Sequence, residues 1–452
     1  MSPQSLTETL SEWLVNQRES GLPDDALAHA RYYILDWLGS ALAGTATQPG
    51  KILLDYAAAQ PDGINAVIGC EARKSAEVAA LVNGGLSHIV EMDDLDRASV
   101  VHPATVVIPA ALAVAERNEC SEADFLAAVV VGYEVAIRIG EAVGKRHYHY
   151  FHNTATCGVS GAAAAAGWLV GLNKEQFVWA LGNAGTMAAG LWQFNADGAM
   201  SKHLHAGQAA SNGVRAADLA KMGFTGTRNI LEGERGFFAA TAPDADPARV
   251  VAGLGDGFKI GGVSIKPHAS CRHTHPAIDG ALILRDQLQA RSITLIEIDT
   301  YQAAISLCDN PNPQTPYAAK FSLHYCVGSA LQYGSAGLRD FELECLLEAD
   351  VRNLIEVTTV RVDPDFEARY PAEWNTALRV TLSDGDMLGT NVTHPKGDPE
   401  NALTQAELER KFREMLAFSG ATVAADDLIA WVKGLGTDVT HRLHFQWAEA
   451  PC

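Results

Sequence analysis

Apolar residues at helical spacing, mixed with many small residues, run through the first 250 residues of the chain. They form the segments Leu6 to Val15, Ala26 to Leu42, Ala76 to His88, Val106 to Arg117, Glu122 to Val143 and Gly158 to Leu172. Apolar positions that recur every three or four residues mark one face of a helix, and dense alanine favours helix further. This part of the chain is therefore expected to be all helical, with backbones packed close together.

The pattern changes near residue 260. The stretch Ile293 to Leu307 contains Ile296-Glu-Ile-Asp-Thr-Tyr, in which apolar and polar residues alternate as in a strand. Residues also alternate from Val357 to Val362 and from Leu378 to Leu382, which predicts further strands. Helical segments lie between these strands, and the chain reads as helical again from Asp398 onward. We expect a mainly α fold with a helical domain over 1–260, a smaller α+β domain over 261–395 and a helical return over 396–452. A return that packs on the first block would make the α+β part an insertion.

The charge of the chain limits its partners. With 34 Lys and Arg against 54 Asp and Glu, the 452 residues carry a formal net charge of −20. Such a chain binds nucleic acid or anionic membrane poorly, although a local basic pocket for an anion remains possible. Met1 to Gln17 lacks the pattern of a signal peptide, and no stretch of about 18 apolar residues is present. A cytoplasmic location without membrane or nucleic-acid partners is expected.

Four carboxylates and one histidine lie in the stretch from Glu91 to His102. Asp93, Asp94 and Asp96 lie between these two residues. A loop that holds carboxylates and a histidine suits general acid–base chemistry or metal binding. The alternative is a solvated acidic loop that caps the next helix.

Two further segments place cations beside histidines or small residues. Lys145 to His152 precedes a helix of small residues, where cations and free backbone N–H groups favour an anion. Lys202 begins another helix of small residues and suits carboxylate binding or, when desolvated, proton transfer. The alternatives are an amphipathic aromatic surface for the first segment and an ordinary exposed lysine for the second.

The segment from Lys266 to His275 is dense in ionisable groups. Cys271, His273 and His275 offer zinc ligands, but Lys266 and Arg272 would repel a cation. A cationic pocket for a polycarboxylate fits the mixture better, and a solvated basic loop is the plain alternative. Farther along, Tyr325 opens a helix and is a candidate proton donor, although a tyrosine in such a place is more often part of the core.

These segments, in this order, resemble the MmgE/PrpD family, whose members include 2-methylcitrate dehydratase, cis-aconitate decarboxylase and iminodisuccinate epimerase. The resemblance covers nearly the whole chain. Its most specific motifs are Glu91-Met-Asp-Asp with His102-Pro-Ala, Ser201-Lys-His-Leu-His-Ala-Gly-Gln and Lys266-Pro-His-Ala-Ser-Cys-Arg-His-Thr-His. The resemblance implies a large helical domain with an inserted α+β lid domain, a homodimer, and chemistry that needs no metal or organic cofactor.

The resemblance also implies the site residues. It assigns catalysis to Asp93, His102, His152, Lys202 and Tyr325, and substrate binding to Asp94, Lys266, Cys271, Arg272 and His275. In the decarboxylase branch a second histidine takes the place of Cys271, and the spacing from Asp94 to His102 is about one residue shorter. Both departures argue against cis-aconitate decarboxylase itself and favour a member related to the dehydratase or the epimerase.

The reactions of this family share one chemical requirement. A C–H or C–CO₂ bond beside a carboxylate breaks, so the enzyme must stabilise the negative charge that develops there. We therefore expect a cofactor-free lyase, of the hydro-lyase type, or an epimerase that acts on a small di- or tricarboxylate. Two alternatives remain open. One is a metal-dependent hydrolase built on Cys271, His273 and His275, and the other is a non-catalytic carboxylate-binding protein.

Overall fold

The computed structural model describes residues 4–71, 73–289, 291–438 and 441–443. It is mainly helical, which confirms the mainly α part of the expected fold class. The chain divides into two compact units. The first comprises residues 1–89, 93–263 and 408–452, and the second comprises residues 90–92 and 264–407. The three residues Val90–Met92 therefore leave the first unit and return to it within one loop.

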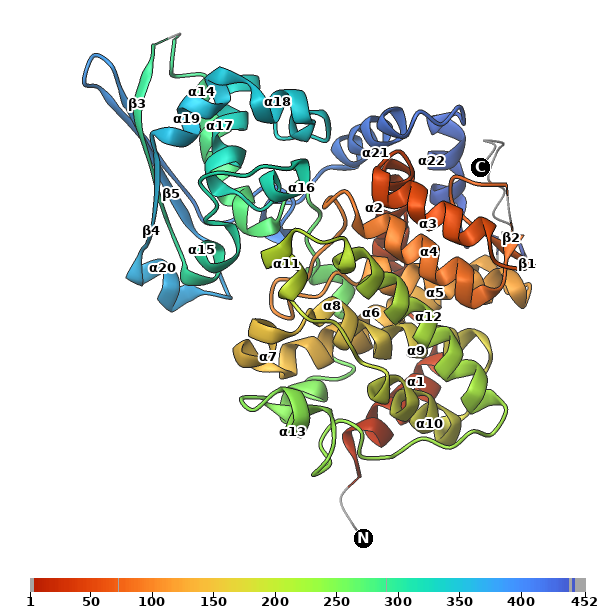
Figure 1. The fold of residues 1–452 in the computed structure, drawn as a ribbon. Helices are drawn as coiled ribbons and strands as arrows, with labels where there is room; N and C mark the ends of the chain where they lie inside the picture. Colours follow the sequence, from red (N-terminus) through yellow and green to blue (C-terminus); the bar gives the residue numbers. More distant parts are fainter. Residues whose placement is uncertain (1–3, 72, 290, 439–440, 444–452) are drawn as a thin grey trace. The chain divides into compact units, whose positions relative to one another are not determined.

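The first unit is built from helices and one small hairpin (Figure 1). Its helices are α1 (Leu6–Ser20), α2 (Asp24–Thr45), α3 (Gln48–Ala58), α4 (Ala76–His88), α5 (Ala104–Arg117), α6 (Glu122–Ala142), α7 (Gly144–Tyr150), α8 (Asn153–Thr156), α9 (Gly158–Leu169), α10 (Lys174–Thr186), α11 (Gln193–Asp197), α12 (Ser201–Lys221), α13 (Phe237–Thr241), the greater part of α21 (Gln405–Ser419), and α22 (Ala425–Gly434). The strands β1 (Asp62–Ala66) and β2 (Arg73–Lys74) pair antiparallel, and the short 3-10 helices η1 (Pro247–Val250) and η2 (Lys259–Gly262) end the first block.

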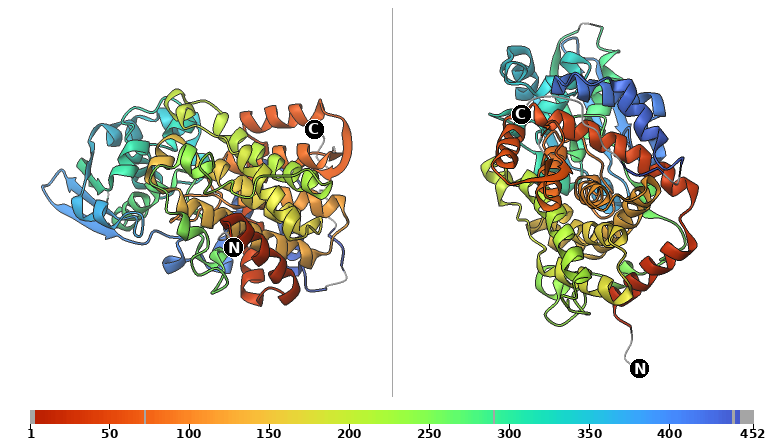
Figure 2. Two further views of the ribbon diagram at one scale, coloured as in Figure 1. Left: turned by 90° about the horizontal axis from the view of Figure 1, so that it is seen from below. Right: turned by 90° about the vertical axis from the view of Figure 1, so that its right-hand side faces the viewer.

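Small residues let the central helices of this unit approach closely. Helix α5 is buried from Ala104 to Ala115 and packs against α4, α6, α9 and α12, which Figure 2 shows from two further directions. Where α4 crosses α12, a Cβ atom on Gly207 would come 2.1 Å from the carbonyl oxygen of Leu81, and one on Gly84 would come 3.0 Å from Cα of Gly207. Only glycine allows this spacing. The crossing therefore fixes the end of α4 against the start of α12.

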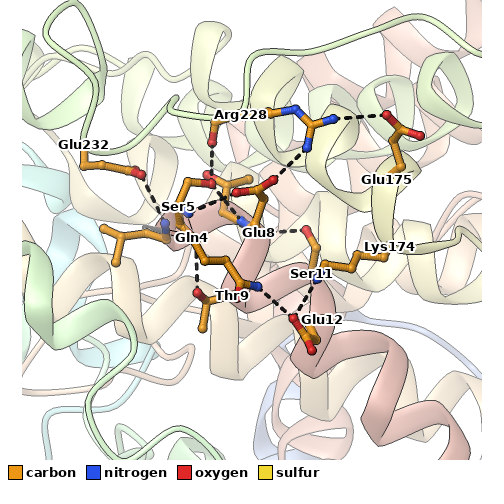
Figure 3. A network of polar contacts seen from close by, with 12 residues as sticks. Gln4, Ser5, Glu8, Thr9, Ser11, Glu12, Lys174, Glu175, Arg228 and Glu232 are labelled. Atoms are coloured by element: carbon orange, nitrogen blue, oxygen red, sulfur yellow. Dashed lines mark hydrogen bonds and ion pairs between the residues drawn. The ribbon is translucent and has the colours of Figure 1, made fainter. Parts of the chain in front are cut away.

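Polar contacts attach α1 to the rest of the first unit (Figure 3). Ser5 and Glu8 form a capping box, in which the Ser5 hydroxyl accepts from the Glu8 amide and the Glu8 carboxylate accepts from the Ser5 amide. Arg228 donates to Glu8 at 2.7 Å and to Glu175 at 3.1 Å. The start of α1 is thereby tied to α10 and to the loop after α12.

The second unit is a four-stranded sheet with helices. Its strands are β3 (Ile293–Thr300), β4 (Thr358–Val362), β5 (Thr376–Leu382) and β6 (Met387–Val392), in the order β4-β3-β5-β6. Strands β3 and β4 are parallel, whereas the other pairs are antiparallel. The helices are α14 (His275–Arg285), α15 (Gln302–Cys308), α16 (Pro316–Ala319), α17 (Leu323–Tyr333), α18 (Leu343–Leu347), α19 (Ala349–Glu356) and α20 (Pro364–Arg369), with the 3-10 helices η3 (Arg272–Thr274), η4 (Arg339–Phe341) and η5 (Pro399–Asn401). Helices α14, α17 and α19 lie on one face of the sheet (Figure 1).

The second unit extends to residue 407, whereas we expected the helical return to begin at residue 396. The main chains of Ile265 and Gly397 are joined by a 2.9 Å hydrogen bond, and Asp398 pairs with Arg272. These long-range contacts hold residues 396–407 in the second unit, and the chain leaves it inside α21 at Leu408. Sequence periodicity predicts helix α21, but it carries no information about these long-range contacts.

Among the described residues, none of the helices has both the length and the apolar character that crossing a membrane requires.

Candidate acid–base site

Four elements of the first unit bring a buried group of histidines together. His88 is the last residue of α4, and the loop that follows carries Asp93 and, just before α5, His102. His152 precedes α8, and Lys202 lies in the first turn of α12. All five residues are at most 8% exposed. The close crossing of α4 and α12 explains why residues so far apart in sequence belong to one cluster.

Asp93 lies at the centre of this cluster. Its Oδ2 atom accepts a hydrogen bond from Nδ1 of His88 at 2.7 Å, and Nδ1 of His102 lies 2.9 Å from the same oxygen. The side chains of His88 and Asp93 are completely buried, and that of His102 is 11% exposed. The backbone N–H of His102 donates to the Thr154 hydroxyl at 3.1 Å, which fixes the loop beside α8. A buried carboxylate thus orients two imidazole rings.

The ring of His152 continues the cluster. It stacks on His88 with centroids 5.4 Å apart and an interplanar angle of 11°. It also contacts the rings of His205 and Trp192, at 5.6 Å and 5.0 Å. Neither ring nitrogen of His152 has a hydrogen-bond partner among the described residues. Buried polar atoms are nearly always paired with protein atoms or with water, so the two ring nitrogens of His152 can each take a water molecule or a ligand as partner.

Burial keeps two of these histidines neutral. Desolvation lowers the pKa of His152 well below its usual value, and the charges of His88 and Lys202 lower it further. Desolvation, His88 and Lys202 also lower the pKa of His205 to about 4. At neutral pH both rings are therefore neutral and can accept a proton. An anion that entered beside Lys202 would raise both pKa values, because it would favour the protonated rings.

Asp94, the neighbour of Asp93, has different surroundings. Its carboxylate accepts from the Tyr133 hydroxyl at 2.7 Å and from the backbone N–H of Ala104 at 3.0 Å, at the start of α5. Desolvation raises its pKa well above the usual value, against the two hydrogen bonds, and the charge of Asp93 raises it further. Asp94 therefore lies in the helical core, where it holds the loop against α5 and α6.

The atoms around Asp93 are close enough to hold a cation, and we compared both possibilities. Nδ1 of His88, Nδ1 of His102 and a carboxylate oxygen of Asp93 all lie within 4.8 Å of one another. Two ligands of a tetrahedral zinc ion would be about 3.3 Å apart, since each lies at 2.0–2.1 Å from the ion. The observed 2.7 and 2.9 Å are both shorter than that spacing, and the His88 contact is a hydrogen bond. The geometry therefore fits direct contacts of Asp93 with the two rings better than an intervening zinc ion.

The zinc ligands considered from sequence do not converge in the part of the chain that the structure describes. His275 directs Nδ1 at Arg272 and Nε2 at the Ser270 carbonyl, at 2.8 Å and 3.2 Å. His273 stacks on Trp374 at 4.3 Å and bonds the Tyr301 hydroxyl through Nδ1. The hydrolase alternative was wrong about this ligand set, because neighbouring rings and carbonyls engage the two imidazoles.

The second unit contains two buried lysines near Val90–Met92. Lys266 is completely buried, and its Nζ lies 3.4 Å from a carboxylate oxygen of Glu91. Lys320 donates to the carbonyls of Val90 at 3.0 Å and of Ala269 at 2.8 Å. Glu91 has a φ of 59°, in the left-handed region that residues other than glycine rarely adopt. Such strain is commonly found at functional loops, so the short excursion of the chain is a second place of interest.

Arg272, Cys271 and Tyr325 also lie in the second unit, each with partners of its own. Arg272 is 2% exposed and donates to Asp398 and to the carbonyl of Lys396. Cys271 is half-buried beside Cys308, whose thiol pKa is raised by burial and by that contact. The Tyr325 hydroxyl donates to the carbonyl of Asp340, and burial raises its pKa.

Two sequence profiles of one family match almost the entire chain. The MmgE/PrpD N-terminal domain matches residues 8–250, and the MmgE/PrpD C-terminal domain matches residues 268–435. The chain belongs to the MmgE/PrpD family. The resemblance stated from its motifs is thereby confirmed.

Curated relatives in the MmgE/PrpD family share 26–29% of their residues with this chain. A cis-aconitate decarboxylase-like protein of Aspergillus oryzae is 29% identical over 91% of this chain and 90% of its own length. The cis-aconitate decarboxylase of Aspergillus terreus is 26% identical, with 91% and 89% covered, and that of Homo sapiens is 28% identical, with 96% and 92% covered.

The sequence did not assign a role to two residues of this MmgE/PrpD chain, His88 beside Asp93 and Glu91 beside Lys266. His88 marked the end of a helix, and only its position five residues before Asp93 could have pointed to a contact. Glu91 was counted among four carboxylates, but the sequence offered no sign that it would pair with Lys266, 175 residues away. Both contacts depend on long-range packing.

Proposed function

We propose that this MmgE/PrpD protein is a lyase or epimerase that breaks a bond next to a carboxylate of a small di- or tricarboxylate. The observation that carries this proposal is the buried contact of Asp93 with the imidazoles of His88 and His102. A carboxylate that holds Nδ1 of a histidine leaves Nε2 with the lone pair of a general base. The names of the curated relatives support the lyase class.

His102 is the proposed base. Its side chain is partly exposed, whereas His88 is completely buried, so a substrate can approach His102. Lys202 would bind a substrate carboxylate and stabilise the negative charge that grows on it after the proton is removed. Because His152 is neutral when the site is empty, it takes up a proton only after an anion has arrived, and it can then return that proton to the product.

Three outcomes are compatible with a stabilised carbanion beside a carboxylate. Removal of a proton followed by loss of hydroxide gives dehydration, and removal of a proton followed by its return to the other face gives epimerisation. In decarboxylation the loss of CO₂ itself forms the carbanion, which is then protonated. Similarity to cis-aconitate decarboxylases makes cis-aconitate the first compound to test. Cys271, at the place where the decarboxylase branch carries a histidine, keeps dehydration and epimerisation among the proposals.

The remaining residues assigned from sequence have roles that need separate tests. Lys266 and Cys271 stay proposed substrate contacts, and we test them by KM. Asp94, Arg272, His275 and Tyr325 have hydrogen-bond partners within their own units, so we propose that they support the fold first. A homodimer is proposed from the family resemblance, and a cytoplasmic location also stays a proposal.

Proton NMR in D₂O tests the proposed function. The purified protein is incubated with cis-aconitate, 2-methylcitrate, citrate and the stereoisomers of iminodisuccinate, and deuterium is expected at a carbon beside a carboxylate of one compound. His102→Ala and Lys202→Ala should lower the rate at least about 100-fold. His149→Ala is the matched control, because His149 is an exposed histidine outside the cluster.

Other results would contradict this proposal. Unchanged rates in the His102→Ala and Lys202→Ala variants would reject the assigned roles. A ligand that raises the thermal midpoint without any exchange or product would instead support a carboxylate-binding protein.

A further inference from the structure

His88 is the histidine of the cluster to which neither the motifs nor the proposed chemistry assigns a role of its own. Its side chain is completely buried, and its Nδ1 makes the shorter of the two contacts to Asp93 Oδ2, at 2.7 Å against 2.9 Å for His102. It is also the contact with hydrogen-bond geometry. One carboxylate oxygen therefore serves a deep ring, His88, and a ring nearer the surface, His102.

The two rings are carried by different kinds of backbone, a packed helix for His88 and a loop for His102. His88 ends α4, a helix fixed by its close crossing with α12 at Gly84 and Gly207. Asp93 and His102 both lie in the segment between α4 and α5, which has no helix or extended strand of its own. A side chain on a packed helix is placed more exactly than one on a loop. His88 is thus the fixed point from which Asp93 takes its orientation.

The Oδ2 atom of Asp93 interacts with both rings, so the negative charge of Asp93 acts on His88 and on His102. A hydrogen bond from His88 satisfies part of the carboxylate and so reduces its attraction for a proton on His102. The other groups near His88 and His102 are His152, which stacks on His88, and then His205 and Lys202 from α12. Among these groups Asp93 carries the negative charge, so its division between the two rings decides how readily His102 is protonated.

We propose that His88 is a positioning residue, which fixes Asp93 through its Nδ1 hydrogen bond and thereby sets how strongly Asp93 holds His102. This inference rests on the proposed function, in which His102 is the base. It adds a third member to the Asp93–His102 pair and gives α4 a role in the reaction.

Two amide variants of His88 provide a matched test. In His88→Asn the amide nitrogen takes the place of Nδ1 and still donates to Asp93, whereas in His88→Gln the amide lies near the former position of Nε2. We expect His88→Asn to keep kcat within about fivefold. We expect His88→Gln to lower kcat about 10- to 100-fold with KM changed less than threefold, since substrate contacts remain. The acid limb of the kcat profile should move up by about one pH unit in His88→Gln alone.

A second measurement needs no substrate. Two-bond ¹H–¹⁵N spectra of protein labelled with [¹⁵N]histidine report which ring nitrogen carries the proton, and His102 is assigned by the loss of its signals in His102→Gln. His102 should be protonated on Nδ1 in the wild type and in His88→Asn. In His88→Gln the pH midpoint of its titration should rise by about one unit.

These measurements test the proposed function and the role of His88 separately. If the wild type exchanges no proton of any compound, the proposed function fails, and the NMR titration still tests the role of His88. The inference is overturned if His88→Asn and His88→Gln behave alike, or if the His102 titration in His88→Gln matches that of the wild type. It is supported if the Asn variant preserves both values and the Gln variant does not.

Discussion

The hydroxyl of Tyr133 donates a 2.7 Å hydrogen bond to the carboxylate of Asp94, so this carboxylate belongs to the helical core of the first unit. Its neighbour Asp93 accepts from His88 at the same distance and lies among histidines. Two adjacent carboxylates therefore have different environments, and their variants should have different consequences.

Asp93→Asn and Asp94→Asn form a matched pair for activity. Asp93→Asn removes the charge that orients His102 and should lower kcat about 10²- to 10⁴-fold. Asp94→Asn keeps an acceptor for Tyr133 and should lower kcat less than about tenfold. Rates of deuterium exchange in D₂O measure both effects. Equal losses in the two variants would contradict the separation of their roles.

Asp94→Ala should destabilise the fold. It leaves the Tyr133 hydroxyl and the Ala104 amide without their acceptor inside the core, which costs about 2–4 kcal/mol. Asp94→Asn should cost less than half of that, because its amide oxygen still accepts one of the two hydrogen bonds. Urea unfolding followed by circular dichroism compares the variants. A loss below about 1 kcal/mol for Asp94→Ala would show that the site is not structural.

Glu116 should make stability depend on pH. Desolvation raises the pKa of Glu116 to about 7, against the favourable Ala66 amide and Arg73. A folded-state pKa above the unfolded value of about 4.5 means that stability is fully present below pH 4.5 and is lost as pH rises through 7. Relative to Glu116→Gln, which keeps an acceptor for the Ala66 amide, the wild type should lose up to about 3 kcal/mol over this window. Urea midpoints at pH 4.5, 6 and 8 measure the difference, and parallel curves would contradict the assignment.

The buried pair of Arg272 and Asp398 should contribute strongly to the second unit. The two side chains are 2% and 0% exposed, and Asp398 also accepts from the Ser264 hydroxyl at 2.7 Å. Asp398→Asn leaves the guanidinium without its counter-charge and should cost about 3–5 kcal/mol. Asp246→Asn breaks an exposed pair with Arg249, about 60% exposed on each side, and should stay within about 0.5 kcal/mol. Similar values for both variants in urea unfolding would refute the prediction.

Tyr325→Phe decides between a structural and a catalytic hydroxyl. The hydroxyl donates to the Asp340 carbonyl, so its removal should cost about 1–2 kcal/mol while kcat stays within about tenfold. Thermal unfolding and steady-state rates measure the two effects separately. A loss of kcat above about 100-fold at full stability would assign proton donation to Tyr325, as the family resemblance suggested.

Local patterns in the sequence predicted the helical part of the fold well. The segments Ala76 to His88 and Glu122 to Val143 closely match α4 and α6, because each helix has its own capping residue and its own buried face. The sequence led us to expect the helical return from residue 396, whereas contacts divide the chain at Leu408. The contacts of Ile265 with Gly397 and of Arg272 with Asp398 span more than 120 residues and leave no local signal.

The sequence pointed to the segments that carry the candidate site, but not to the contacts between their side chains. The loop with Asp93 and His102 and the helix start with Lys202 were identified by residue type and spacing. Which of two adjacent aspartates faces the histidines depends on Tyr133, a residue of α6 that the motifs do not include. His88 could not be assigned for a similar reason, since its contact depends on the turn of the chain between α4 and α5.

The excursion of Val90–Met92 limits how this architecture can be inherited. Lys266 and Lys320 of the second unit find their partners at Glu91 and at the Val90 carbonyl. A segment 264–407 transplanted without this loop would leave two buried ammonium groups lacking those contacts. The second unit is therefore not a portable module, and a gene rearrangement could exchange it only together with a tripeptide encoded more than 170 codons upstream.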